Sequence, residues 1–416
     1  MPEVFLFRLK LFYLVLLCLI ITSCVTPARN INIPQTNVRI ENTSLRIFIN
    51  DENKLNGWQE IADIYVQQNP DVNIEFLAVP KSDYKTALRV KLDSYEPPSV
   101  FMINGGDDLT LFSDKLENVQ GHIPQDVFEN AAEYVTNKKG VFGIPLTLTG
   151  YGFLYNTKIF KQAKINADNF SIFENLSKMI ETLNDKINTK TFKKKFPELT
   201  HSFGMGDKSK WAEILRIENF IIPFEYETPK KYKAMSRFDF AYKNRFESMF
   251  SLISDNAKPE FSSFIDEFSK EKAAIIAADT SFLYDIYTQN DDIELAIAPM
   301  VIGSWRQRSI LLGCTDFLAI NSDLPILEKN VAIEFANWLF ATDEGLELLA
   351  DKLFLNPPYN NISSSVNNSL ETPKNAVIKQ IYQFYNDEKY IKQFTPTINK
   401  DDFTKNLYEL ITSFYN

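Results

Sequence analysis

Apolar and polar residues between positions 44 and 103 switch repeatedly between the period of a strand and that of a helix. Residues 44–50, 72–77 and 100–103 have the alternating or continuously apolar pattern of buried strands. Residues 57–68 and 84–92 instead place apolar side chains three and four positions apart, as on one face of a helix. The order β-α-β-α-β predicts a parallel sheet with crossover helices.

The pattern becomes mostly helical after residue 156. Apolar residues at helical spacing predict helices near residues 157–165, 170–187, 208–221, 240–254, 258–270, 328–341, 377–386 and 401–414. Short apolar runs predict strands at residues 273–278 and 294–299, and a longer apolar segment follows at 310–320. No tandem repeat with a period of roughly 20 to 50 residues is visible.

Residues 143–156 form an extended segment that must bend. Pro145 excludes a helix near its start, and apolar residues then alternate with threonines. Gly150 and Gly152 flank Tyr151, and we expect these glycines to let the backbone bend. The chain is therefore predicted to cross here between two lobes, with Tyr151 facing the cleft.

The composition limits the possible functions. The chain has 416 residues, of which 45% are hydrophobic, and this is enough for two globular domains. Its net charge of −10 argues against a nucleic-acid partner, because an acidic surface does not follow a phosphate backbone. The two histidines, His122 and His201, are far apart in sequence, which leaves little for a histidine metal site or a Ser/His/Asp triad. No metal or cofactor is expected.

The N-terminal segment predicts export. Arg8 and Lys10 precede a run of apolar residues, 11–21. This run is too short to span a membrane, and its length is that of the apolar region of a signal peptide.

The residues after this run predict a lipid anchor. Residues 21–24 (ITSC) resemble a bacterial lipobox, so residues 1–23 are predicted to be removed and Cys24 to be lipidated. An ordinary signal peptide with an incidental cysteine is the alternative. The polar residues 24–43 would then be a flexible tether. Cys314 would be the one remaining thiol, which excludes an intramolecular disulfide in the mature chain.

Several motifs occur in the order found in one family of transport proteins. They are residues 47–54 (IFINDENK), 58–70, 98–101 (PSVF), 143–145 (GIP), 152–160 (GFLYNTKIF), 336–339 (ANWL), 342–347 (TDEGLE) and 354–362 (FLNPPYNNI). Together, and behind a lipobox, they make the chain resemble the family 1 extracellular solute-binding proteins of ABC transporters, the group that includes maltose-binding protein.

The resemblance implies the α/β fold of two-lobed periplasmic binding proteins of class II type. Such a fold has a ligand cleft between its lobes and closes by a hinge motion at the crossings. The crossings would lie near residues 148–150, 312–316 and 355–359. The N-terminal lobe would comprise residues 44–148 and 316–356, and the C-terminal lobe residues 149–315 and 357–416.

Polar residues follow two of the predicted parallel strands, at the edge where open α/β sheets bind ligands. They are Asp51, Glu52 and Asn53 after the first strand, and Asn104, Asp107 and Asp108 after the third. Carboxylates accept hydrogen bonds from sugar hydroxyls, and asparagine both donates and accepts. The alternative is that these are solvated turn residues.

Aromatic side chains, which can cover the C–H faces of a sugar ring, are the second class of candidate. Trp58 and Trp338 lie on apolar helix faces and are expected in the core, whereas Trp305 lies in a polar loop. Members of the family often have an acidic residue at the position of Thr149. They also often have a sugar-stacking tryptophan in the segment that matches residues 274–284, and this segment has none here. The full list of ligand-binding candidates is Asp51, Glu52, Asn53, Asn104, Asp107, Asp108, Thr149, Tyr151, Trp211, Asp279, Phe282, Tyr284, Trp305, Arg306 and Tyr359.

The sequence thus predicts a monomeric solute-binding lipoprotein of an ABC importer, and not an enzyme. It would bind a sugar or oligosaccharide and deliver it to the transmembrane permease subunits. The lipidated Cys24 would anchor it in the cell envelope, at the outer face of the cytoplasmic membrane or in the periplasm. Three alternatives stay open: a cationic ligand such as a polyamine, a surface adhesin on the same scaffold, and a secreted glycosidase, which needs two convergent carboxylates.

Overall fold

The computed structural model describes residues 43–122, 124, 127–128, 131–166, 170, 172–206, 243–258, 263–300, 309–359, 371–387 and 391–393. The chain divides into two compact units, residues 1–41 and 42–416, and every described helix and strand belongs to the second. The predicted signal segment, Cys24, and the predicted helices at 208–221 and 401–414 lie outside the described residues.

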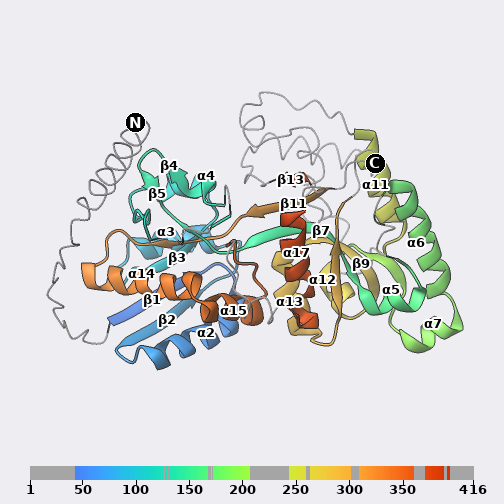
Figure 1. Ribbon diagram of the computed structural model, residues 1–416, viewed down its shortest axis with the longest axis horizontal. Coiled ribbons are helices and arrows are strands. Elements are labelled where there is room, and N and C mark those ends of the chain that lie inside the picture. Colours follow the sequence, from blue (N-terminus) through green and yellow to red (C-terminus); the bar gives the residue numbers. More distant parts are fainter. Residues whose placement is uncertain are drawn as a thin grey trace, which may run out of the picture. The chain divides into compact units, whose positions relative to one another are not determined.

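The three N-terminal strands pair in parallel, as predicted, and belong to a five-stranded sheet that two later strands complete with antiparallel pairing (Figure 1). Its order is β2(Val72–Ala78), β1(Thr43–Ile49), β3(Val100–Ile103), β12(Phe317–Ile320) and β6(Ile144–Pro145). β1 pairs in parallel with both β2 and β3, and the crossovers are α2(Leu55–Gln68) and α3(Tyr84–Leu92). Because all three strands run the same way, their carboxyl ends meet at one edge, next to the short elements η2(Glu52–Lys54) and α4(Gly106–Leu111).

Two later helices cover this first sheet. α14(Ile326–Ala341) packs on β1 and β12, and α15(Asp343–Leu353) packs on α2 and α14. Trp58 is 1% exposed, as expected for a core residue, although it also lines the cavity described below. Trp338 is half-buried, stacks on Phe335 and donates a hydrogen bond from Nε1 to Glu344.

The second sheet is built around β7(Leu148–Asn156). Its order is β13(Ile391–Gln393), β11(Ser309–Cys314), β7, β9(Ala273–Asp279) and β8(His201–Gly204), and β10(Leu295–Ala298) also pairs with β7. The helices of this part are α5(Thr157–Ala163), α6(Phe173–Ile187), α7(Lys190–Lys195), α11(Lys243–Asp255), α12(Phe264–Ser269), α13(Leu283–Gln289) and α17(Ala376–Asn386). The sequence pattern missed β8 and overestimated the length of α12.

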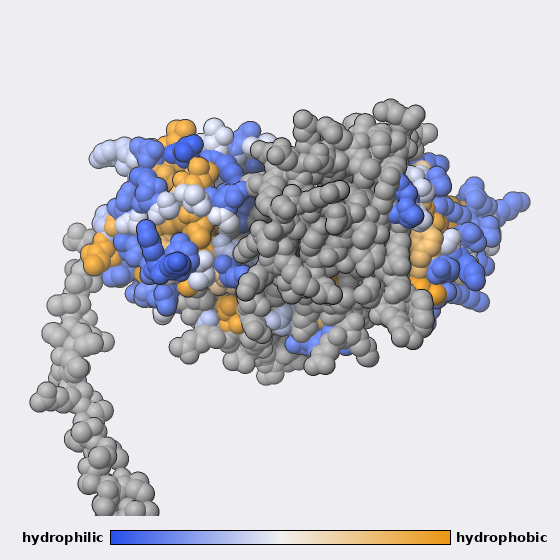
Figure 2. All heavy atoms as spheres, turned by 90° about the horizontal axis from the view of Figure 1, so that it is seen from above, coloured by the Kyte–Doolittle hydropathy of each residue, from blue (hydrophilic) through white to orange (hydrophobic). Residues whose placement is uncertain are grey.

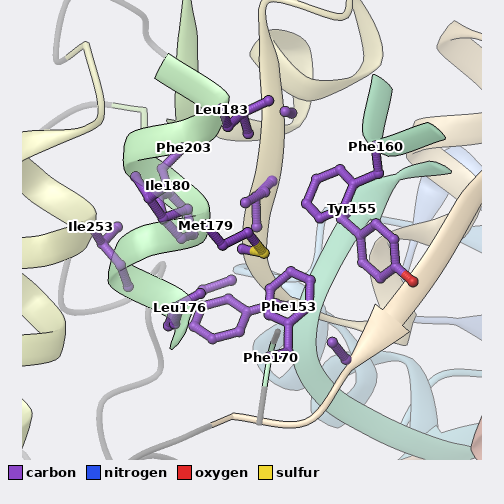
Figure 3. Packing of buried hydrophobic residues seen from close by; sticks show 14 of the residues in the cluster. Phe153, Tyr155, Phe160, Phe170, Leu176, Met179, Ile180, Leu183, Phe203 and Ile253 are labelled. Carbon is purple, nitrogen blue, oxygen red and sulfur yellow. The ribbon is translucent and has the colours of Figure 1, made fainter. Parts of the chain in front are cut away.

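An aromatic cluster joins α5 and α6 to the second sheet. Phe153 and Tyr155 from β7 pack with Phe160 and Phe170, with ring centroids between 4.5 and 5.8 Å apart. Figure 3 shows Met179 and its neighbours on α6 beside these rings. The remaining short elements are η3(Glu133–Val135), the hairpin β4(Thr136–Asn137) with β5(Gly140–Val141), η6(Thr280–Phe282) and η7(Pro373–Asn375).

The structure corrects the predicted role of the glycines at the crossing. Gly150 and Gly152 lie inside the continuous strand β7, and neither has a positive φ. A Cβ at Gly152 would lie 2.5 Å from the carbonyl oxygen of Ala298, and one at Gly150 would collide with Cδ1 of Ile381. The glycines therefore permit close packing, and the change of sheet falls earlier, between β6 and β7.

Three segments link the two sheets and lie side by side. They are residues 146–147 between β6 and β7, Thr315 and Asp316 between β11 and β12, and the residues that follow α15. Leu146 N donates to Asp316 O (2.9 Å), and Leu148 N donates to Asn356 O (2.6 Å). These backbone hydrogen bonds hold the three segments together.

Candidate functional site

A cavity of about 290 Å³ lies where the carboxyl ends of β1 and β3 face η6 and α13. This volume is at the lower end of the range of small-molecule sites, roughly 300–1,000 Å³. Its lining combines apolar side chains with charged ones from distant parts of the chain. The lining residues are Ile49, Asn50, Asp51, Lys54, Trp58, Lys81, Met102, Leu146, Thr147, Ser281, Phe282, Asp285, Asp316 and Leu355.

Asp51 is placed by the end of β1 and by the cap it makes. Its Oδ1 accepts a hydrogen bond from the backbone N of Asn53 (3.1 Å), which starts η2. Its Oδ2 lies 3.3 Å from Nζ of Lys54. Asp51 and Lys54 therefore line the cavity as an ion pair. Glu52 and Asn53 are exposed and do not line it.

Asp316 lies at the second link between the sheets and lines the cavity. Its carboxylate accepts hydrogen bonds from Asn104 Nδ2 (2.9 Å), Thr315 Oγ1 (3.0 Å) and Asn50 Nδ2 (3.4 Å). The two asparagines directly follow β3 and β1, and both amides donate to Oδ1, so they tie the carboxylate to the first sheet.

The surroundings of Asp316 keep its side chain charged. Burial alone would raise the pKa of this carboxyl, but the ammonium groups of Lys81 and Lys54 and the hydrogen bonds outweigh it, so the pKa is lowered. At neutral pH Asp316 is therefore a preorganised hydrogen-bond acceptor. The sequence pattern located a crossing here but did not identify Asp316 as a site residue, because its donors are far away in sequence.

The opposite wall comes from η6 and α13. Asp279, which is 1% exposed, does not line the cavity; its Oδ1 accepts from the backbone N of Ser281 (2.9 Å) and so holds the turn that presents Ser281 and Phe282. Asp285 does line the cavity. Burial and the nearby Asp51 carboxylate raise its pKa, against the opposing effects of Lys54 and Asn53.

Two contacts join this wall to the first sheet's side of the cavity. Asn53 Nδ2 donates to Asp285 Oδ1 (3.3 Å). Tyr284 is half-buried and hydrogen-bonds the backbone of Gly57; burial raises the pKa of its hydroxyl, and this hydrogen bond partly opposes the rise. The cavity is thus closed on this side by residues from both parts of the fold.

The cavity lies at the carboxyl ends of parallel strands, between two linked α/β sheets. The sequence of this part of the chain also matches a known family. Residues 51–345 match the model of the family described as Bacterial extracellular solute-binding protein. The chain belongs to this family. No similar sequence was found among curated proteins.

Solved structures of other solute-binding proteins share the fold. They include a periplasmic solute-binding protein from Pectobacterium atrosepticum (14% identity, TM-score 0.65), an ABC substrate-binding protein from Listeria monocytogenes in complex with cycloalternan (13%, 0.63) and a sugar transporter from Bacillus licheniformis in complex with stachyose (17%, 0.61). Each comparison covers 89% of this chain and 94%, 94% and 95% of the other chain, respectively. The two-lobed α/β fold expected from the sequence is confirmed.

Several predicted site residues of this solute-binding protein lie behind the cavity wall. Asn104 orients Asp316, as described above. Asp108 is buried, accepts from the backbone N of Asn104 (2.8 Å) and pairs with Lys85 Nζ (2.6 Å). Asp107 is exposed in the first turn of α4 and does not line the cavity.

Other predicted residues belong to the core. Tyr151 is 3% exposed and packs in the cluster with Phe153, because alternate residues of β7 share one face. This corrects the expectation that Tyr151 faces the cleft. Tyr359 is also buried and donates its hydroxyl hydrogen bond to Pro145 O (3.1 Å). Thr149 is buried, with its Oγ1 3.4 Å from that of Thr315.

The remaining candidates, Trp211, Trp305, Arg306 and Cys24, lie outside the described residues. Within the described ranges, no helix is long and apolar enough to cross a membrane. The same ranges hold no group of three His, Cys, Asp or Glu residues that could bind a metal ion.

Proposed function

We propose that this extracellular solute-binding protein binds a sugar or oligosaccharide in the cavity between its two sheets and delivers it to the permease of an ABC importer. The observation that carries the proposal is the preorganised carboxylate of Asp316 in a cavity lined from both sheets. Two proteins of similar fold were solved with the saccharides cycloalternan and stachyose.

The chemistry of the lining supports a saccharide. Asp316 and Asp51 offer acceptors for ligand hydroxyls, and Asn50 offers an amide. The ring of Phe282 and the aliphatic side chains offer an apolar surface for the C–H groups of a sugar ring. The lining holds three carboxylates and two lysines, so its net charge is small, which favours a neutral ligand over a polyamine.

Several further features belong to the same proposal. The lobes would comprise residues 44–148 with 316–356, and 149–315 with 357–416. Lipidated Cys24 and the tether of residues 24–43 would anchor a monomer in the cell envelope. Ligand binding would favour the closed arrangement to the extent that the ligand binds it more tightly than the open one.

A thermal-shift screen followed by calorimetry tests the proposal. The panel contains mono-, di- and oligosaccharides, including stachyose, together with spermidine. A saccharide at about one hundred times its dissociation constant should add roughly 2.7 kcal/mol to the free energy of unfolding. A shift with spermidine alone would refute the sugar assignment, and turnover of a bound saccharide would favour the glycosidase alternative.

Two variants locate the site once a ligand is found. Asp316→Asn should weaken binding about 10- to 100-fold, since it removes a charged acceptor worth roughly 1.5–3 kcal/mol. Asp71→Asn makes the same chemical change at an exposed position outside the cavity and should leave affinity unchanged. Equal affinities for both variants would place the ligand elsewhere.

A further inference from the structure

The short helix α7 of this acidic protein presents a basic face. Lys190, Lys193 and Lys194 are exposed and lie at the i, i+3, i+4 spacing of one helix face. Phe192 and Phe196 are buried in the aromatic and aliphatic cluster of the second sheet and fix the helix to it. The lysines are therefore held on a rigid element, although their own side chains extend into solvent.

Paired and unpaired lysines both occur in the described part of the chain, and those of α7 are unpaired. Lys115 lies within 4 Å of Asp93 and Asp323, and Lys352 lies within 4 Å of Glu60, whereas Lys91, Lys138 and Lys139 have no such carboxylate there. Within the described ranges, no ion pair involves Lys190, Lys193, Lys194 or Lys195.

The surrounding sequence leaves this charge unneutralised. Residues 186–197 contain five lysines and no acidic residue, and Asp185 and Glu198 flank them. Lys195 donates to Gln162 of α5 (2.6 Å), a neutral partner. A concentrated positive charge thus occurs in a chain whose net charge is −10.

The basic face is separate from the ligand cavity. No α7 residue lines the cavity, and Figure 1 shows α7 at the end of the second sheet's half that is remote from β1 and β3. Figure 2 shows hydrophilic side chains beside an apolar strip at this end of the molecule. An interaction at α7 would therefore leave the cavity accessible.

We propose that the basic face of α7, defined as Lys190, Lys193 and Lys194 with Lys195 beside them, docks on an anionic lipid surface. Each lysine near an anionic lipid surface raises the affinity for that surface about fivefold, because its ammonium group is attracted to the lipid phosphates. The large apolar side chains exposed in the described part are Val90, Tyr95, Leu111 and Ile326, and none belongs to α7. The contact is therefore electrostatic and peripheral, without insertion into the bilayer.

Vesicle co-sedimentation tests this inference with residues 42–416, the compact unit that holds every described element. Binding to vesicles of phosphatidylglycerol and phosphatidylcholine is compared with binding to phosphatidylcholine alone, at about 20 mM and 150 mM salt. We expect binding to the anionic vesicles that weakens at the higher salt, since screening shortens the range of the attraction. Equal binding to both vesicle types, or none to the anionic ones at low salt, overturns the proposal.

Two triple variants with the same loss of charge distinguish the effect of the basic face from the effect of net charge on vesicle binding. K190Q/K193Q/K194Q should lower the partition coefficient up to about 100-fold, since three lysines each contribute roughly fivefold. K91Q/K138Q/K139Q removes the same charge from exposed lysines on the first sheet's side and should change it less than about twofold. An equal loss in both variants would refute a specific role for α7. Glutamine keeps the helix propensity of lysine, and an unchanged unfolding midpoint confirms that both variants fold.

Discussion

The carboxylate of Asp316 gives the sharpest test of how the site is held together. Asp316→Asn keeps the size of the side chain but removes its charge. It also brings an NH₂ group among three donors, those of Asn104, Thr315 and Asn50. A hydrogen bond to a charged group contributes roughly 1 kcal/mol more than a neutral one. Two of the three bonds are short, so weakening them loses about 2 kcal/mol.

A further loss comes from a donor that faces the new NH₂ group, at roughly 1–3 kcal/mol. The free energy of unfolding should therefore fall by about 3–5 kcal/mol at pH 7. Urea unfolding without ligand measures it, with Asp71→Asn as the control, expected within about 0.5 kcal/mol of the parent protein. A variant that unfolds at the same urea concentration as this control would refute the role assigned to the Asp316 network.

The pH dependence of the same difference is a second criterion. The folded-state pKa of Asp316 is lowered, so its stabilising effect is fully present above the pKa of an unfolded aspartate, about 3.9. The effect is lost as the pH falls through the lower, folded-state pKa. The difference between Asp316→Asn and the parent should thus be constant near neutral pH and shrink below about pH 4. A difference that does not change with pH would mean that packing, and not charge, causes it.

Three other substitutions test neighbouring features. Gly150→Ala should lower the free energy of unfolding by roughly 1–3 kcal/mol, because its Cβ would collide with Ile381, and an unchanged urea midpoint would contradict the close packing of α17 on β7. Asp285→Asn should raise stability above the elevated folded-state pKa of Asp285, since it removes a charge that burial and the Asp51 carboxylate disfavour. The gain should disappear as the pH falls below that pKa, and urea unfolding from pH 4 to 8 checks the sign. Tyr151→Ala should lower stability by about 3 kcal/mol in urea unfolding, as large-to-small changes in a core do. Calorimetry on the folded variant should show an unchanged ligand affinity. A variant that keeps its stability but loses ligand binding would show that Tyr151 contacts the ligand in the cleft.

The hydrophobic pattern by itself determined most of the first sheet. Apolar periods of two and 3.6 residues located β1, β2, β3, α2 and α3 to within about two residues, because these elements bury one continuous face. The same pattern identified β7 as extended and placed a crossing beside it. Ligand-binding residues were predicted at the carboxyl ends of the strands, and Asp51 lines the cavity there.

The tertiary structure decided which polar groups meet. Asp316 receives its hydrogen bonds from Asn50 and Asn104, which lie 266 and 212 residues away in sequence, and no local pattern encodes such a contact. It also decided that Gly150 accommodates a helix from the far end of the chain and that Tyr151 points into the core. Periodicity specifies which face of an element is buried, whereas the partner of that face depends on how distant segments pack.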